Sequence, residues 1–166
     1  RHLLDAVADA RNRGFSVVSL ETTGAPLNRG AFVREGIKRG LTHAVLVPGD
    51  EVALRDAAKA MRDRGLPWVL RIEPSGDELD SCIAVADLAH EAGASVLALS
   101  MAEATTQASL AEVADATRKA LEYSAALGLG MVVYGLPFCL LGEHVDKLSP
   151  TPPVSPVDGD GRPVWG

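Results

Sequence analysis

Acidic side chains follow the apolar runs of this 166-residue sequence at regular places, and they have the clearest chemical potential. In the segments ETTGAP, PGDE, EPSGDE and SMAEATT, the first carboxylates after the apolar runs are Glu21, Asp50, Glu73 and Glu103. Carboxylate oxygens that converge at one end of a sheet could hold a hard divalent cation. Capping of the following helix is the alternative, and it fits Asp50 and Asp77 better. Both interpretations stay open for the other three acids.

Cysteine and histidine offer few further possibilities. The chain has two cysteines and no CxxC pair, which is too few for a disulfide framework. His144 follows Cys139 by five residues, so the two side chains could form a nucleophile or half of a metal site. The weak metal-ligand candidates are Glu21, Glu73, Glu103 and Cys139.

Five segments of one form must position these residues. Each has helical spacing, then a glycine, then an apolar run, and the glycines are Gly14, Gly40, Gly65, Gly93 and Gly128. A glycine in the left-handed conformation ends a helix at low cost. The β-branched run that follows predicts a strand buried on both faces. Strands that alternate with helices at this period predict a parallel sheet with right-handed crossovers.

Apolar stripes at helical spacing support the expected helices. The stripe before Gly65 consists of Val52, Ala53, Ala57, Ala60 and Met61. The stripe before Gly93 consists of Leu79, Cys82, Ile83, Ala86, Leu88 and Ala89. The longest helix is expected at about 110–127, with Leu110, Val113, Ala114, Thr117, Ala120, Leu121 and Ser124 in register.

Neither GxGxxG nor GxxxxGK[ST] occurs, which favours a barrel over an open doubly wound sheet. We therefore expect an α/β domain at residues 1–148, a partial, TIM-barrel-like (β/α) barrel with about five parallel strands. An irregular Pro/Gly-rich tail is expected at residues 149–166.

Charge and hydropathy exclude some classes of partner. The net charge of −6 and the lack of a Lys/Arg run argue against a nucleic-acid surface. No apolar stretch reaches membrane-spanning length, and the first residues have a helical pattern rather than that of a signal peptide. We expect a cytoplasmic protein. The sequence starts at Arg1, inside an expected helix, which favours a piece of a longer protein.

Several segments, taken in order, resemble the later part of a radical S-adenosylmethionine enzyme domain. VVSLETTGAPL is similar to a strand that commonly ends in Thr-Asn-Gly, with Thr22, Thr23 and Gly24 in that place. AFVREGIKRGLTHAVLVPGD resembles the next unit, whose turn glycine corresponds to Gly49. LPWVLRIEPSGDELDSCIAVADLAHEAGASVLALSMAE looks like the fifth and sixth strands with their helix. LEYSAALGLGMVVYGLPFCLLGE is the closest match, because many members end the barrel with a Leu-Pro-x-Cys-Leu-Leu phrase.

The resemblance implies cofactor or substrate contacts at these residues: Thr22, Thr23, Gly24, Gly49, Arg71 and Glu73. An inward Arg71 could hold a carboxylate bidentately, and its alternative is pairing with Glu21 or Glu73. The family's CxxxCxxC loop and Gly-Gly-Glu-Pro segment are absent, and Leu46 stands where a ribose-binding Ser is usual. S-adenosylmethionine and a four-iron–four-sulfur cluster are therefore expected only if a missing N-terminal part supplies the cysteines.

Cys139 occupies the place of the family's post-barrel cysteine. In some members this cysteine precedes the ligands of an auxiliary cluster, but no further cysteine follows it here. We therefore expect Cys139 to be a buried hydrophobic residue, and we expect Cys82 to lie in the core.

Three functions are compatible with the sequence. The first is a truncated or degenerate radical S-adenosylmethionine-like protein that is not competent for radical chemistry alone. The second is a non-catalytic assembly module, whose open sheet edges pair in a homo-oligomer or are covered by a partner. The third is a divalent-cation-dependent lyase or isomerase that uses Glu21, Glu73 and Glu103. The substrate, a small molecule or a peptide, is not identified.

Overall fold

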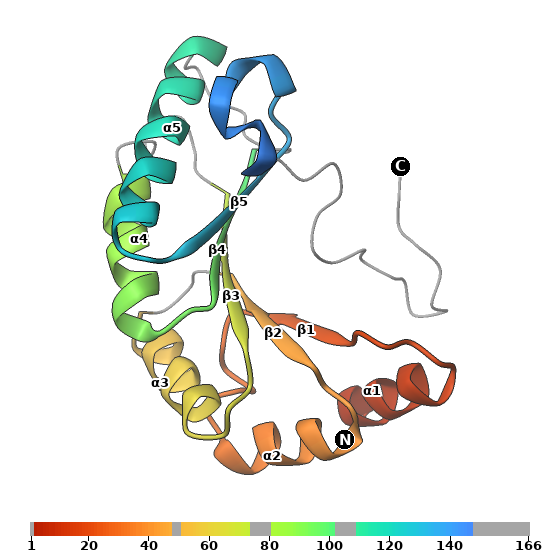
Figure 1. The fold of residues 1–166 in the computed structure, drawn as a ribbon. Helices are drawn as coiled ribbons and strands as arrows, with labels where there is room; N and C mark the ends of the chain where they lie inside the picture. Colours follow the sequence, from red (N-terminus) through yellow and green to blue (C-terminus); the bar gives the residue numbers. More distant parts are fainter. Residues whose placement is uncertain (1, 48–50, 74–80, 102–108, 148–166) are drawn as a thin grey trace.

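The computed structural model describes residues 2–47, 51–73, 81–101 and 109–147, in which strands alternate with helices (Figure 1). The first half contains α1 (His2–Asn12), β1 (Ser19–Thr22), α2 (Gly30–Arg39), β2 (His43–Leu46) and α3 (Glu51–Arg62). The second half contains β3 (Trp68–Ile72), α4 (Ser81–Ala92), β4 (Val96–Ser100), α5 (Leu110–Ala126) and β5 (Gly130–Tyr134). Two short 3-10 segments follow, η2 (Phe138–Leu140) and η3 (Gly142–Lys147).

The five strands pair in chain order, from β1 to β5, and every pair is parallel. β1 and β5 are the edges of this sheet, so the described strands do not close into a full barrel. Figure 1 shows α2 to α5 along the convex side of the curved sheet, whereas no described helix covers the concave side. The predicted partial, TIM-barrel-like α/β architecture is therefore confirmed.

The predicted glycines end the helices as expected. Gly40 follows α2 with a φ of 106°, and its N–H donates to the carbonyls of Gly36 and Ile37. The other four predicted glycines also have positive φ angles. Each of the five is followed by one strand of the sheet, so the period in the sequence located the elements correctly.

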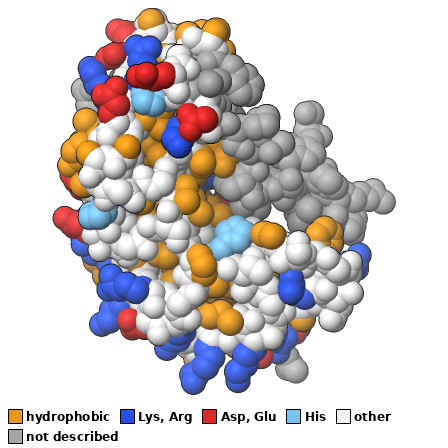
Figure 2. Space-filling model, in the orientation of Figure 1, with side chains coloured by type: hydrophobic (Ala, Val, Ile, Leu, Met, Phe, Trp, Pro, Cys, Tyr) orange, Lys and Arg blue, Asp and Glu red, His pale blue; other side chains and the backbone are white. Residues whose placement is uncertain are grey.

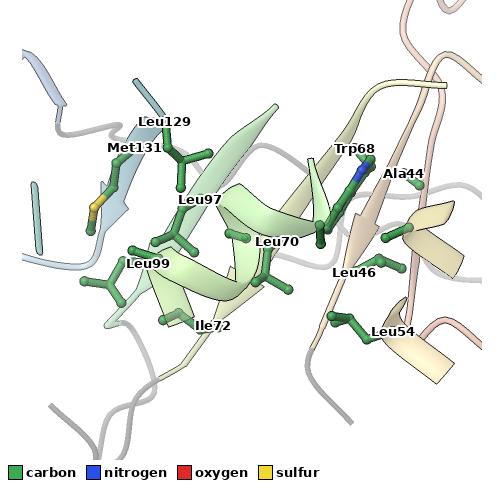
Figure 3. Packing of buried hydrophobic residues seen from close by; sticks show 14 of the residues in the cluster. Ala44, Leu46, Leu54, Trp68, Leu70, Ile72, Leu97, Leu99, Leu129 and Met131 are labelled. Atoms are coloured by element: carbon green, nitrogen blue, oxygen red, sulfur yellow. The ribbon is translucent and has the colours of Figure 1, made fainter. Parts of the chain in front are cut away.

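The hydrophobic core lies between the sheet and its helices. Trp68, Leu70 and Ile72 alternate along β3 and are all buried in one cluster, which includes Leu46 of β2 and Leu54 of α3 (Figure 3). Most predicted stripe positions are buried, including Ala57, Ala60, Met61, Cys82, Ala86, Ala89, Val113, Ala114, Thr117, Ala120, Leu121 and Ser124. The prediction that Cys82 is a core residue is confirmed.

Three predicted stripe positions are wrong. Val52, Ile83 and Leu110 are 69%, 39% and 62% exposed. Each lies in the first turn of its helix. The prediction for α3 also missed Leu54, which is 2% exposed and lies one turn beyond the start of the helix.

None of the helices in the described ranges combines the length and the apolar character that crossing a bilayer would require. The tail at 149–166 and Leu79 lie outside the described residues.

Candidate functional site

The concave side of the sheet has its own set of side chains. Successive side chains of a strand point to opposite faces, and Val45 and Ala98 are buried without belonging to the helix-side core. The register places Val45 beside Val69, and Ala98 beside Arg71 and Val132. We call this set the inner face, and it comprises Ser19, Glu21, His43, Val45, Val69, Arg71, Val96, Ala98, Ser100, Val132 and Tyr134.

The inner face is only partly buried. Val69, Val96 and Val132 have intermediate exposure, whereas Leu70 and Leu97 on the opposite face are fully buried. The sequence predicted strands that are buried on both faces. That prediction is confirmed for Val45, Ala98 and Tyr134, which are buried, and it is wrong for the three valines, which are only partly covered.

Arg71 forms two ion pairs on the inner face. Its Nη1 donates to Glu21 Oε2 at 3.1 Å, and its Nη2 donates to Glu73 Oε1 at 2.7 Å. The three side chains are 21%, 33% and 34% exposed, in the order Arg71, Glu21, Glu73. Of the two alternatives left open for Arg71, the structure shows the ion pairing, and Arg71 pairs with both Glu21 and Glu73.

This Arg71 cluster links two strands that are not neighbours. β2 lies between β1 and β3, and Val45 of β2 stands beside Glu21 on one side and Val69 on the other. Val45 is 0% exposed although no described helix covers its face. The Arg71 side chain of β3 therefore reaches across β2 to Glu21 of β1.

Two carboxylates and one guanidinium give the Arg71 cluster a net charge of −1. Within the described part of the chain, the second oxygen of each carboxylate makes no hydrogen bond. Arg71 Nε is buried and also has no hydrogen-bond partner among the described residues. A buried donor without a partner costs about 1–3 kcal/mol, so the cluster retains polar capacity that a bound group could satisfy.

The predicted divalent-cation site stays a prediction. The part of the chain that the structure describes contains no group of three or more His, Cys, Asp or Glu side chains placed to hold a metal ion. Glu21 and Glu73 share Arg71, so a guanidinium already supplies positive charge to both carboxylates. Asp50, Asp77, Glu103 and Gly49 lie outside the described residues.

The Thr22–Gly24 turn follows β1 and is held against α3. Thr22 Oγ1 accepts a hydrogen bond from the N–H of Gly24 at 3.3 Å. Gly24 is buried with a φ of 102°, and a Cβ at this position would lie 3.1 Å from the carbonyl oxygen of Ala53. Thr23 is exposed. Cofactor contacts of Thr22, Thr23 and Gly24 stay a prediction, and the structure adds that their turn has a fixed place at the carboxyl end of the sheet.

The prediction that Cys139 is buried is wrong. Cys139 is exposed in η2, whereas Leu136 and Leu141 are 7% and 0% exposed. The chain turns tightly after β5, and these two leucines take the buried positions of the LPFCLL phrase. Nearby, His144 Nε2 lies 3.9 Å from Glu122 Oε1, so His144 faces α5.

The other histidines do not contribute to the Arg71 cluster. His2 and His90 are exposed on helices. His43 begins β2, at the opposite end of the inner face, and its Nδ1 lies 3.2 Å from Thr42 Oγ1. Burial lowers the pKa of His43, because it disfavours the charged imidazolium.

Sequence reasoning missed two polar residues of the inner face. Ser100 and Tyr134 are partners in the β4–β5 register, two residues beyond the pair of Ala98 and Val132. They therefore extend the carboxyl end of the inner face beyond Arg71. The alternation of side chains between the two faces of each strand could have indicated these residues. It identifies a shared face only once the register between the strands is known.

No family model matches the chain, and no curated protein matches it. Among solved structures, that of an L-ribulose 3-epimerase superposes with a TM-score of 0.55 at 13% sequence identity. The match covers 79% of this chain and 58% of the epimerase, so the chain spans less than two thirds of that structure's length. At this identity the match shows a common TIM-barrel-like fold alone.

Proposed function

We propose that this chain forms the ligand-binding wall of a TIM-barrel-type enzyme, and that its inner face binds a small molecule through Glu21 and Glu73. One observation carries the proposal. Each carboxylate gives one oxygen to Arg71, and its second oxygen is unbonded within the described residues. These side chains lie toward the carboxyl ends of β1 and β3, the end at which parallel α/β folds bind their ligands.

The chemistry of the Arg71 cluster selects for hydrogen-bond donors. A carboxylate oxygen accepts hydrogen bonds, so ligand groups that fit are ammonium and hydroxyl groups. Charge-assisted hydrogen bonds from Arg71 hold both carboxylates in place before a ligand arrives. The net charge of −1 favours a cationic or neutral ligand group over an anionic one at this point.

S-adenosylmethionine is our first candidate ligand for two reasons. Several segments of the chain, taken in order, resemble radical S-adenosylmethionine enzymes, and S-adenosylmethionine carries an ammonium group and ribose hydroxyls. In this proposal, Glu21 and Glu73 accept hydrogen bonds from those groups, and the Thr22–Gly24 turn borders them. The sequence has two cysteines, so a cluster-binding CxxxCxxC segment would have to come from elsewhere.

A sugar isomerase or epimerase is the second candidate, favoured by the fold shared with the L-ribulose 3-epimerase. A ketose would present hydroxyl groups to Glu21 and Glu73. A carboxylate within hydrogen-bond reach of such a substrate could also transfer a proton to or from it. Bound divalent metal in the purified protein would support this candidate over the first.

Isothermal titration calorimetry with S-adenosylmethionine and, separately, with L-ribulose tests the proposal. Glu21→Gln and Glu73→Gln should each weaken binding of the true ligand at least tenfold, which is about 1.4 kcal/mol. Glu35→Gln is the matched control, because Glu35 also pairs with an arginine, Arg39, but on α2. The proposal fails if neither ligand binds or if Glu35→Gln weakens binding as much as the inner-face substitutions do.

A further inference from the structure

Arg71 stands at the border between a charged part and an aliphatic part of the inner face. Glu21 and Arg71 lie over β1 to β3, with Glu73 one residue beyond β3. Toward β4 and β5, the inner-face residues in the same rows as Glu21 and Arg71 are aliphatic, and the polar pair of Ser100 and Tyr134 lies beyond them at the carboxyl end. We call this second part the valine floor, and it consists of Val69, Val96, Ala98 and Val132.

The valine floor is continuous and partly open. Val69 pairs with Val96 across β3 and β4, and Ala98 pairs with Val132 across β4 and β5. The three valines have intermediate exposure and Ala98 is buried, whereas the helix-side residues of the same strands are covered. Figure 2 shows hydrophobic side chains at the surface in the middle of the molecule, above a lower end that carries many Lys and Arg side chains.

An aliphatic surface next to a few convergent polar groups is the usual composition of a small-molecule site. The charged part is complementary to a donor-bearing, cationic group, since it combines two carboxylates with one guanidinium. The floor offers no side-chain hydrogen-bonding group, so it can contribute binding free energy only through contact with an apolar surface of the ligand. The two parts adjoin, because Arg71 pairs in register with Ala98 of the floor.

We propose that the ligand of this site is amphipathic, with an ammonium- or hydroxyl-bearing head on Glu21 and Glu73 and an apolar body over the valine floor toward β5. This inference rests on the proposed function and narrows its ligand class. A bare pentose would occupy the charged part and leave the floor in contact with water.

Titration with n-alkylammonium chlorides, from ethyl to octyl, tests the inference. NMR of the valine methyl groups should show saturable shifts at Val69, Val96 and Val132. Burial of one methylene contributes about 0.8 kcal/mol, which is about fourfold in affinity. Because the floor is half open, affinity should rise about two- to fourfold with each added methylene. Val17 is the control for non-specific adhesion, because it is 62% exposed and precedes β1.

Substitutions distinguish the contribution of the ligand's polar head to affinity from that of its apolar body. Glu21→Gln should weaken all chain lengths by the same factor, whereas Val132→Thr and Val69→Thr should flatten the dependence on chain length. Threonine keeps the branched shape that suits a strand, so both variants should fold. The inference would be overturned if the NMR signals of Val17 shifted as much as those of the valine floor. It would also be overturned if binding required Glu21 but its affinity did not change with the length of the alkyl chain. In the second case the proposed function would stand. If neither the alkylammonium ions nor the ligands in the calorimetric test bind, the proposed function fails as well.

Discussion

The two faces of the sheet are built from the same strands, yet they are suited to different tasks. Along β3, Trp68, Leu70 and Ile72 are buried under the helices, whereas Val69 and Arg71 between them are only partly buried. The helix side is a continuous apolar core. The inner face combines an ion-pair cluster with half-open valines. Most of the buried apolar surface therefore lies on the helix side, and the inner face can carry the polar groups of the proposed ligand site.

The outer helices provide a second arginine between two carboxylates. Arg39 pairs with Glu35 at 2.9 Å and also with Asp5, and it thereby joins α1 to α2. Its hydrogen bond with Glu35 raises the pKa of Arg39 and lowers the pKa of Glu35. The Arg39 cluster ties two helices together on the outside, whereas the Arg71 cluster faces the concave side. The molecule therefore contains its own control for the function of Arg71.

The largest predicted effect is a difference in unfolding free energy between substitutions at two neighbouring residues of β3. Leu70→Ala should lower the free energy of unfolding by about 2–5 kcal/mol, because Leu70 is 0% exposed within the core. Val69→Ala should lower it by about 1 kcal/mol or less, because Val69 buries only part of its surface. Urea unfolding measures both values. Equal losses would show that the inner face is packed as tightly as the core.

A smaller effect should come from the turn that connects the inner face to the helix layer. Gly24→Ala should cost about 1–3 kcal/mol of unfolding free energy, because the backbone has a φ of 102° and a Cβ would lie 3.1 Å from Ala53 O. Gly128→Ala is the control, with a positive φ of 71° but no atom within 4 Å of a Cβ. If both variants lose the same stability in urea unfolding, the contact of Gly24 with α3 contributes nothing.

Much of this architecture could be predicted from the sequence, because its signals are local. A glycine after an apolar stripe, followed by a β-branched run, located all five strands. The pairing of Arg71 with Glu21 joins residues 50 positions apart, and it was only one of two alternatives until the register was known. The inner face could not be recognised, because it exists only when strands from distant segments align. Cys139 was misplaced because the 3-10 turn, rather than hydropathy, decides which residues of LPFCLL are buried.

The smallest effect should appear as a pH dependence at the amino end of the inner face. Burial holds the pKa of His43 below its unfolded value of about 6.5. Folding therefore favours neutral His43, so its contribution to stability is complete above about pH 6.5 and is lost as pH falls through the folded pKa. The melting temperature should fall less between pH 8 and pH 5.5 in His43→Gln than in the unsubstituted protein. An equal fall would assign the pH dependence to other groups.

The most direct test of the central claim compares the two arginine clusters in one thermal experiment. S-adenosylmethionine, and in a parallel series L-ribulose, is added to the unsubstituted protein, Arg71→Met and Arg39→Met, and the melting temperature is recorded. A ligand at about one hundred times its Kd contributes about 2.7 kcal/mol, which corresponds to roughly 5–10 °C for a chain of this size. We predict that shift for the unsubstituted protein and for Arg39→Met, and no shift for Arg71→Met. A full shift in Arg71→Met, or its loss in Arg39→Met alone, would contradict the assignment of ligand binding to the inner face.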